Sequence, residues 1–208
     1  MLNSRLPIVL FGDGGHALSV IDLLKARGAQ EIYICGKPDM QKRNYFNLIT
    51  RDEISRHLND FQLALAIGDQ KIRNEFMAQN KDFIENGRFP ALIHPRAYVS
   101  QDSVIGKGAV ILSNAYVGPS VSIGDFSIIN THAIVEHGCN LGKSVILSPN
   151  ATLCGDVKIG SNTFLGVGAC VSPRLELGEN VTVGACSFVL KSVKSNRLVY
   201  GTPARVIK

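Results

Sequence analysis

From Ile93 to Val189 an aliphatic residue recurs at every sixth position, without an insertion or a deletion. Four residues after each of these comes a mostly small or β-branched residue, such as Ala109, Val121 or Ser127. A period of six matches neither the 3.6-residue repeat of a helix nor the two-residue alternation of an amphipathic strand. It predicts a solenoid in which each hexad lays one short strand on one side of a stacked coil. The seventeen aliphatic positions are Ile93, Val99, Ile105, Ile111, Val117, Ile123, Ile129, Val135, Leu141, Leu147, Leu153, Ile159, Leu165, Val171, Leu177, Val183 and Val189.

Glycines recur in the same region at intervals of eighteen residues, so three hexads are expected to form one coil. We expect these glycines to stack at one corner, where a tight turn favours a residue without Cβ. Three-sided coils with inward aliphatic residues resemble the left-handed β-helix of the hexapeptide acyltransferases. The left-handedness of the coil is implied by that resemblance alone, because the general rule for parallel strands is a right-handed crossover. The glycines are Gly106, Gly124, Gly142, Gly160 and Gly178.

The first ninety residues have a different pattern. Apolar runs at residues 7–11, 31–35 and 61–67 predict strands. Helical patterns follow through residues 18–25 with a stop at Gly28, over residues 50–58, and over residues 69–80. The order of strands and helices predicts a small α/β, Rossmann-like domain with a parallel sheet. Breaker residues at 86–90 place the boundary near residue 90. The predicted domains are therefore 1–90, which binds a sugar nucleotide, and 91–208, a β-helical acyltransferase domain with a C-terminal tail.

The loop after the first strand reads Gly12-Asp13-Gly14-Gly15-His16-Ala17. Such a loop between strand and helix presents free N–H groups to an anion such as phosphate, although a tight turn alone also needs glycine. Gly68 follows the third strand at the same predicted edge of the sheet. The second strand leads into Cys35-Gly36-Lys37 without an acid for a ribose, which disfavours NAD. Lys37 is either a phosphate ligand or a solvated charge, and His16 either bonds a ligand or packs on the sheet.

Composition narrows the class of protein. With 45% hydrophobic and 19% charged residues among 208, the chain matches a globular protein. It has neither a long apolar run nor a signal-peptide pattern, so we expect a cytoplasmic protein without a membrane partner. The five cysteines form no CxxC pair and are expected to be reduced. The net charge of +5 favours binding of a polyanionic ligand such as CoA or a nucleotide sugar. The sequence has no basic cluster with interleaved aromatic residues, so we do not expect it to bind nucleic acid.

One predicted coil carries His132, Glu136 and His137. The eighteen-residue register places Gly155 next to His137, which leaves the imidazole open to a ligand. A neutral imidazole is suited to removing a proton near pH 7, although a histidine at a turn is also compatible with a surface role. A zinc site of the β-helical carbonic anhydrase type would need a third histidine two coils before His132, where Arg96 stands. We therefore expect no metal, and His132 is expected to stack between its neighbours on the surface.

Taken together, four segments make the chain resemble the PglD/NeuD family of bacterial sugar acetyltransferases, and the likeness covers nearly the whole chain. They are Gly12-x-Gly14-Gly15-His16, the run from Ala66 to Arg73, the run from Ile129 to His137, and Tyr200-Gly201-Thr202-Pro203-Ala204-Arg205.

This resemblance implies a homotrimer with active sites between adjacent β-helices, acetyl-CoA lying along the coils, and a nucleotide-linked amino sugar on the N-terminal domain. It implies that His137 is the general base for direct attack on the thioester, with Asn130 near the acceptor and Glu136 as the neighbouring acid. Adjacent strand residues point to opposite faces, which weakens the role of Glu136. The implied CoA contacts are Ile146, Gly155, Val167, Gly184 and Ala185. The implied sugar-nucleotide contacts are Gly12, Asp13, Gly14, His16, Lys37 and Gly68.

The chain departs from the family pattern at three places. Gly138 stands where relatives carry an acid after the catalytic histidine, Ile146 replaces a CoA-contacting histidine, and Cys35-Gly36 replaces nucleoside-binding acids. The first hypothesis is N-acetylation of an amino sugar. The alternatives are O-acetylation of a hydroxyl such as that of sialic acid, a non-catalytic β-helical scaffold, and a metal-dependent hydratase. The sequence does not specify the sugar, the nucleotide or the length of the acyl group.

Overall fold

The computed structural model describes residues 6–35 and 47–207. The chain divides into two compact units, Met1–Leu92 and Ile93–Lys208. Within the described ranges, none of the helices combines the length and the apolar character needed to cross a membrane.

The N-terminal unit is built on a parallel sheet with the strand order β3-β2-β1-β4. Strands β1 and β4 are buried along their whole length, which is typical of a parallel sheet covered on both faces. The predicted α/β arrangement is confirmed. The strands are β1 (Ile8–Phe11), β2 (Ile32–Cys35), β3 (Asn47–Ile49) and β4 (Gln62–Leu65), and the helices are α1 (Gly15–Ala26), α2 (Arg51–Arg56), α3 (Gln70–Gln79) and α4 (Lys81–Asn86).

Two elements of this unit were not predicted. Strand β3 is three residues long and buries only Ile49, so it lacks an apolar pattern. Helix α4 is six residues long and has no fully buried residue. The predicted helix at residues 50–58 ends at Arg56, and a 3-10 turn at Leu58–Asp60 follows. Its predicted capping box is present: the Glu53 N–H donates to Thr50 Oγ1, and the Thr50 N–H donates to the Glu53 carboxylate.

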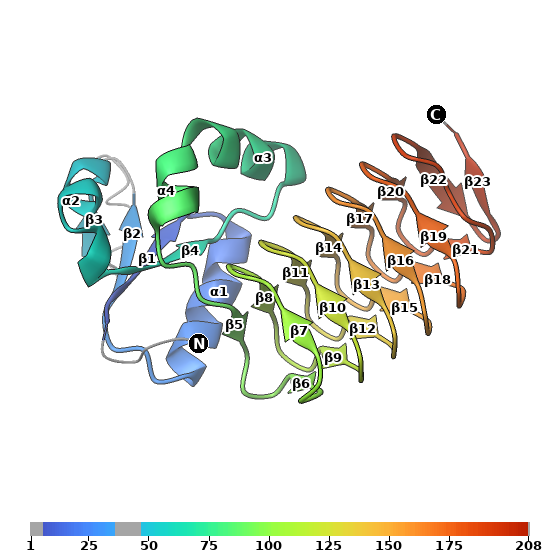
Figure 1. Ribbon diagram of the computed structural model, residues 1–208, viewed down its shortest axis with the longest axis horizontal. Coiled ribbons are helices and arrows are strands. Elements are labelled where there is room, and N and C mark those ends of the chain that lie inside the picture. The colour runs from blue at the N-terminus through green and yellow to red at the C-terminus, as the bar shows by residue number, and fades with distance from the viewer. Residues whose placement is uncertain (1–5, 36–46, 208) are drawn as a thin grey trace. The chain divides into compact units, whose positions relative to one another are not determined.

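The C-terminal unit is a triangular β-helix, as Figure 1 shows from β5 to β22. Strands of the same side pair in parallel with a register of eighteen residues, for example Ile128 with Ile146. The eight-stranded sheet contains β5 (Leu92–Ile93), β8 (Val110–Ile111), β11 (Ile128–Ile129), β14 (Ile146–Leu147), β17 (Phe164–Leu165), β20 (Thr182–Val183), β22 (Leu198–Gly201) and β23 (Ala204–Val206). The six-stranded sheet contains β6 (Tyr98–Val99), β9 (Tyr116–Val117), β12 (Ile134–Val135), β15 (Thr152–Leu153), β18 (Cys170–Val171) and β21 (Phe188–Val189). The five-stranded sheet contains β7 (Val104–Ile105), β10 (Ser122–Ile123), β13 (Asn140–Leu141), β16 (Lys158–Ile159) and β19 (Glu176–Leu177).

Two positions of each hexad fill the interior. From Ile111 to Val189 every one of the predicted aliphatic residues is buried, and they form one core with the small residues four positions later. The close packing of aliphatic and small side chains explains why the six-residue period admits no insertion.

The backbone conformation at the corners of the coil explains which residue types occupy other positions of the hexad. Every sixth residue from Gly108 to Cys186 has a positive φ, and Asn, Ser, Asp and Gly fill most of these places. The glycines spaced by eighteen lie at one of these corners, two residues before the positive-φ position, and the reason for glycine there differs from the predicted tight turn. A Cβ on Gly124 would lie 2.5 Å from the carbonyl carbon and oxygen of Gly142, so these glycines are required by close approach of successive coils.

Candidate active site

His137 lies at the corner between β12 and β13, where the chain leaves the six-stranded sheet for the five-stranded sheet. Gly138, which follows it, has φ +69° and makes the turn. The His137 side chain is exposed, and its ring packs against the Cα of Gly155, one coil later. A Cβ on Gly155 would come within 2.5 Å of His137 Cε1 and 2.6 Å of Nε2. The missing side chain of Gly155 therefore makes room for the imidazole, whereas the sequence suggested room for a ligand.

The N–H group of Gly155 is a second chemical feature of this corner. Prolines occupy the equivalent hexad position at Pro95, Pro119, Pro149 and Pro173, which shows that the strand ladder does not use this N–H. Within the described residues, the Gly155 N–H makes no hydrogen bond, while its carbonyl accepts from Arg174. A donor beside an exposed imidazole is suited to stabilising a developing oxyanion.

An acid of the next coil lies beside the residue that follows His137. A Cβ on Gly138 would collide with the carboxylate oxygen Oδ1 of Asp156, so this carboxylate covers the Cα of Gly138. The Asp156 N–H also donates to the carbonyl of His137 over 2.9 Å. Asp156 was missed at the sequence level, although the eighteen-residue register places it directly over Gly138.

Asn130 and His137 lie at two different corners, at the two ends of the side that carries β12. The side-chain oxygen of Asn130 accepts from the Thr131 N–H over 2.8 Å. Glu136 is half-buried, and its N–H pairs with the carbonyl of Leu153. His132 has φ +57° and stacks on Asn114, with 3.3 Å between Nε2 and the Asn114 amide nitrogen. Its predicted place in a surface stack is confirmed on the Asn114 side.

The predicted CoA contacts divide between the same two corners. Val167, Gly184 and Ala185 share the corner column of Asn130, whereas Gly155 lies at the corner of His137. Val167 is 49% exposed and Gly184 is approached by Cβ of Tyr200. Ile146 is only 3% exposed, so its side chain offers little surface to a ligand in this structure.

The glycine loop of the N-terminal unit lies at the carboxyl ends of β1 and β4. Gly12 has φ +120°, and a Cβ there would lie 2.7 Å from the carbonyl oxygen of Ala66, so both conformation and space require glycine. A Cβ on Gly14 or Gly15 would meet nothing within 4 Å, and Asp13 is exposed. The loop therefore opens onto the first turn of α1, where N–H groups favour an anion. Lys37 lies outside the described residues.

His16 and Arg73 lie beneath the glycine loop, at the carboxyl edge of the sheet. The buried Arg73 guanidinium donates to the carbonyls of Leu65 and Ile67 over 3.2 and 3.0 Å, which ties α3 to the end of β4. Burial, and then the positive charge of Arg73, lower the pKa of His16 to about 4. His16 is therefore neutral at pH 7. A Cβ on Gly68 would lie 3.0 Å from Cβ of His16, so these two positions adjoin at the carboxyl edge of the sheet, where Gly68 was predicted to lie.

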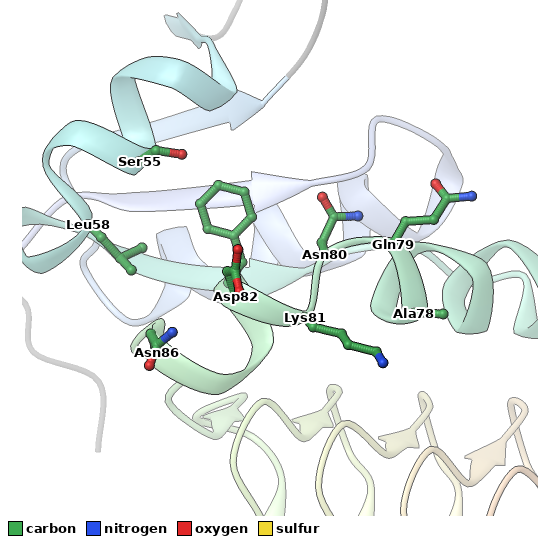
Figure 2. A pocket seen from close by; sticks show the side chains of 9 residues that line it. Ser55, Leu58, Ala78, Gln79, Asn80, Lys81, Asp82 and Asn86 are labelled. Atoms are coloured by element: carbon green, nitrogen blue, oxygen red, sulfur yellow. The ribbon is translucent and has the colours of Figure 1, made fainter.

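The N-terminal unit also has a pocket away from the glycine loop. Its volume is about 420 Å³, and its side chains come from α2, the 3-10 turn and the junction of α3 with α4 (Figure 2). Among the residues that the structure describes, no three His, Cys, Asp or Glu side chains are placed to hold a metal ion together. The pocket is lined by Ser55, Leu58, Ala78, Gln79, Asn80, Lys81, Asp82, Phe83 and Asn86.

Hexads stacked into three parallel sheets are typical of a left-handed β-helix protein of the hexapeptide type. Comparison with known proteins agrees: residues 7–79 match the PglD N-terminal domain, and residues 156–191 match the hexapeptide repeat of succinyl-transferase.

Solved structures extend the likeness over nearly the whole chain. The acetyltransferase domain of PglB from Neisseria gonorrhoeae FA1090 is 30% identical, covers 98% of this chain and 100% of that one, and superposes with a TM-score of 0.89. PerB from Caulobacter crescentus, in complex with CoA and GDP-perosamine, is 32% identical over 98% of both chains, with a TM-score of 0.85. The chain belongs to the PglD family of hexapeptide-repeat sugar N-acetyltransferases.

A curated relative shows a shorter match. UDP-N-acetylbacillosamine N-acetyltransferase from Bacillus subtilis (strain 168) is 33% identical over 127 residues, and the match spans 51% of this chain and 51% of that protein.

Proposed function

We propose that the chain transfers an acetyl group from acetyl-CoA to the amino group of a nucleotide-activated amino sugar, with His137 as the general base. The observation that carries the proposal is the exposed imidazole of His137, packed on Gly155 beside an unused backbone N–H. The relatives support the substrates: the Neisseria domain has been solved with acetyl coenzyme A, and PerB with CoA and GDP-perosamine.

In the proposed reaction the sugar amine attacks the thioester carbonyl in a ternary complex, while an imidazole nitrogen of His137 takes the amine proton. The carbonyl oxygen becomes an oxyanion, which the Gly155 N–H stabilises. The C–S bond then breaks, and the imidazolium returns its proton to the CoA thiolate. No acyl-enzyme forms, so most of the acceleration comes from holding acceptor and thioester together.

We further propose a homotrimer in which each active site lies between two β-helices. The support is the division of the predicted CoA contacts between two corners of one chain. One side of a coil is a hexad long, roughly 20 Å when extended, so the two corners are far apart on a single chain. A groove that contacts both corners forms where the Val167 corner of one copy faces the His137 corner of the next. The apolar residues Tyr98, Tyr116 and Ile134 on the intervening sheet are exposed or partly exposed, which suits a packed face.

The N-terminal domain, residues 1–90, is proposed to bind the nucleotide of the acceptor. Its glycine loop offers the N–H groups of α1 to a diphosphate, and neutral His16 lies beside it. Lys37 stays a predicted phosphate ligand. The substrates are cytoplasmic metabolites, so we propose that the reaction takes place there.

The test is acceptor-dependent release of CoA thiol from acetyl-CoA, with UDP- and GDP-linked amino sugars and sialic acid as acceptors. We expect release with an amino sugar and its loss in His137→Ala. His132→Ala is the matched control, because His132 stacks on Asn114 and is expected to leave turnover unchanged. Release with sialic acid alone would favour O-acetylation, and release that survives His137→Ala would refute the assignment of the base. No release with any acceptor, from a folded protein, would favour a scaffold.

A further inference from the structure

The charge of the chain is concentrated at its C-terminal end. Five of the 22 basic residues and none of the 17 acidic residues lie after Glu179, which equals the whole net charge of +5. The chain before this point is neutral overall. The five basic residues are Lys191, Lys194, Arg197, Arg205 and Lys208.

Large apolar side chains are exposed in the same place. Leu190 is 49% exposed, Val206 is 59% exposed and Ile207 is 53% exposed. Leu190 and Val206 line one pocket of about 570 Å³ together with Lys191 and Arg205. We call Leu190, Lys191, Arg205, Val206 and Ile207 the terminal patch.

The terminal patch lies where the β-helix ends. Figure 1 shows the antiparallel hairpin of β22 and β23 at the end of the stack, next to β20 and beyond the last complete coil. Val199 and Val189 are buried at the floor of the pocket, whereas Val206, which pairs with Val199 in the hairpin, stays exposed. The last two acids of the sequence, Glu176 and Glu179, belong to the preceding coil, and their backbone N–H groups donate to the hydroxyl oxygens of Ser192 and Ser195.

We propose that the terminal patch is a docking surface for a membrane that contains anionic lipids. Basic side chains around exposed aliphatic ones are the combination that binds such a surface, because lysine and arginine approach the head groups while the apolar side chains enter the interface. A free polyanion, such as the phosphate groups of CoA, would account for the charges but not for three exposed aliphatic side chains. The observations favour a membrane over a nucleic acid for the same reason.

The proposal revises the expectation that the protein has no membrane partner. That expectation rested on the lack of an apolar run long enough to span a bilayer, and a peripheral contact needs no such run. Leu190 and Lys191 follow β21 at the same corner of the coil as His137 and Gly155, two coils beyond Gly155, so acetyl transfer by each patch variant is measured beside its binding to vesicles.

The experiment is co-sedimentation of the full chain with vesicles of phosphatidylcholine and phosphatidylglycerol in equal parts, compared with pure phosphatidylcholine. We expect binding only to the anionic vesicles, weakened by added salt. Lys191→Glu with Arg205→Glu is expected to lower binding at least ~10-fold. Val206→Ser with Ile207→Ser is expected to lower it ~10-fold without changing the charge. The matched control is Arg96→Glu with Val104→Ser, which removes an exposed basic and an exposed aliphatic residue from the first coil.

Each other outcome overturns the proposal. Absence of binding to anionic vesicles, or equal losses in the control and the patch variants, would do so directly. Binding that ignores the two serine substitutions but is displaced by CoA would assign the patch to a soluble polyanion. Equal binding to an oligonucleotide at the same salt would assign it to nucleic acid. Normal acetyl transfer in solution by every patch variant separates this result from the proposed function.

Discussion

Replacing Gly155 by alanine tests the corner on which the proposed mechanism depends. The new Cβ would lie 2.5 Å from Cε1 and 2.6 Å from Nε2 of His137, whereas ordinary contacts begin at 3.4 Å. The imidazole must therefore retreat by roughly 1 Å toward solvent or turn to another rotamer. Because His137 is exposed, this movement costs little stability. The N–H of residue 155 remains in place, so the change affects the base and not the oxyanion donor.

A displacement of about 1 Å at a catalytic group lowers turnover on the order of 100-fold. We expect this loss in kcat for Gly155→Ala, with the KM for acetyl-CoA nearly unchanged. The assay is steady-state release of CoA thiol with the accepted amino sugar, over a range of pH. Circular dichroism would show that the fold is retained.

A double-mutant cycle provides the decisive control. If Gly155 acts only by giving the imidazole its place, Gly155→Ala adds nothing to the loss already caused by His137→Ala. Losses that multiply in the double variant would show that Gly155 acts independently of His137. Turnover of Gly155→Ala within about twofold of the parent would refute the reasoning altogether.

Four further predictions concern stability and its dependence on pH. The pKa of His16 falls from 6.5 to about 4 on folding, so the unfolded chain binds its proton first as the pH drops, and stability is lost between pH 6.5 and 4. Between pH 7 and pH 5 the free energy of unfolding, measured in urea, should fall by about 2 kcal/mol less in His16→Gln than in the parent chain. An equal dependence of this free energy on pH in both chains would refute the prediction. Thr50→Ala should cost about 1 kcal/mol through the capping box, and no change would show that α2 does not depend on it. Ile129→Ala should cost about 2–5 kcal/mol because a fully buried side chain leaves a cavity, and a cost below about 1 kcal/mol would mean that the coil collapses around it. Gly124→Ala should strongly destabilise the β-helix, since its Cβ would meet backbone at 2.5 Å, whereas Gly15→Ala, with open space, should not; equal melting temperatures would contradict this.

Sequence and structure agree most closely in the β-helix. The aliphatic residues from Ile111 to Val189 are buried as the six-residue period predicts, and the eighteen-residue register appears directly in the strand pairs. A periodic pattern of this kind is a local property repeated many times, so one mistaken position does not alter the result. The first strand, the glycine loop and the cap at Thr50 were also predictable, because each depends on neighbouring residues.

Other features had no local pattern to reveal them. Strand β3 is mostly exposed and α4 is short, so neither carries a hydrophobic period. The stacking glycines were assigned to one corner correctly but for a different reason, since close approach between Gly124 and Gly142 depends on the distance between coils.

The sequence alone determined the fold class, the length of the coil and the register that places Gly155 beside His137, because repetition along the chain carries that information. Only the tertiary structure decided what surrounds the histidine: the imidazole fills the space left by Gly155, and Asp156 covers Gly138. It also decided that burial beside Arg73 keeps His16 neutral. These are contacts between residues far apart in the chain, and their geometry depends on how closely successive coils and strands pack.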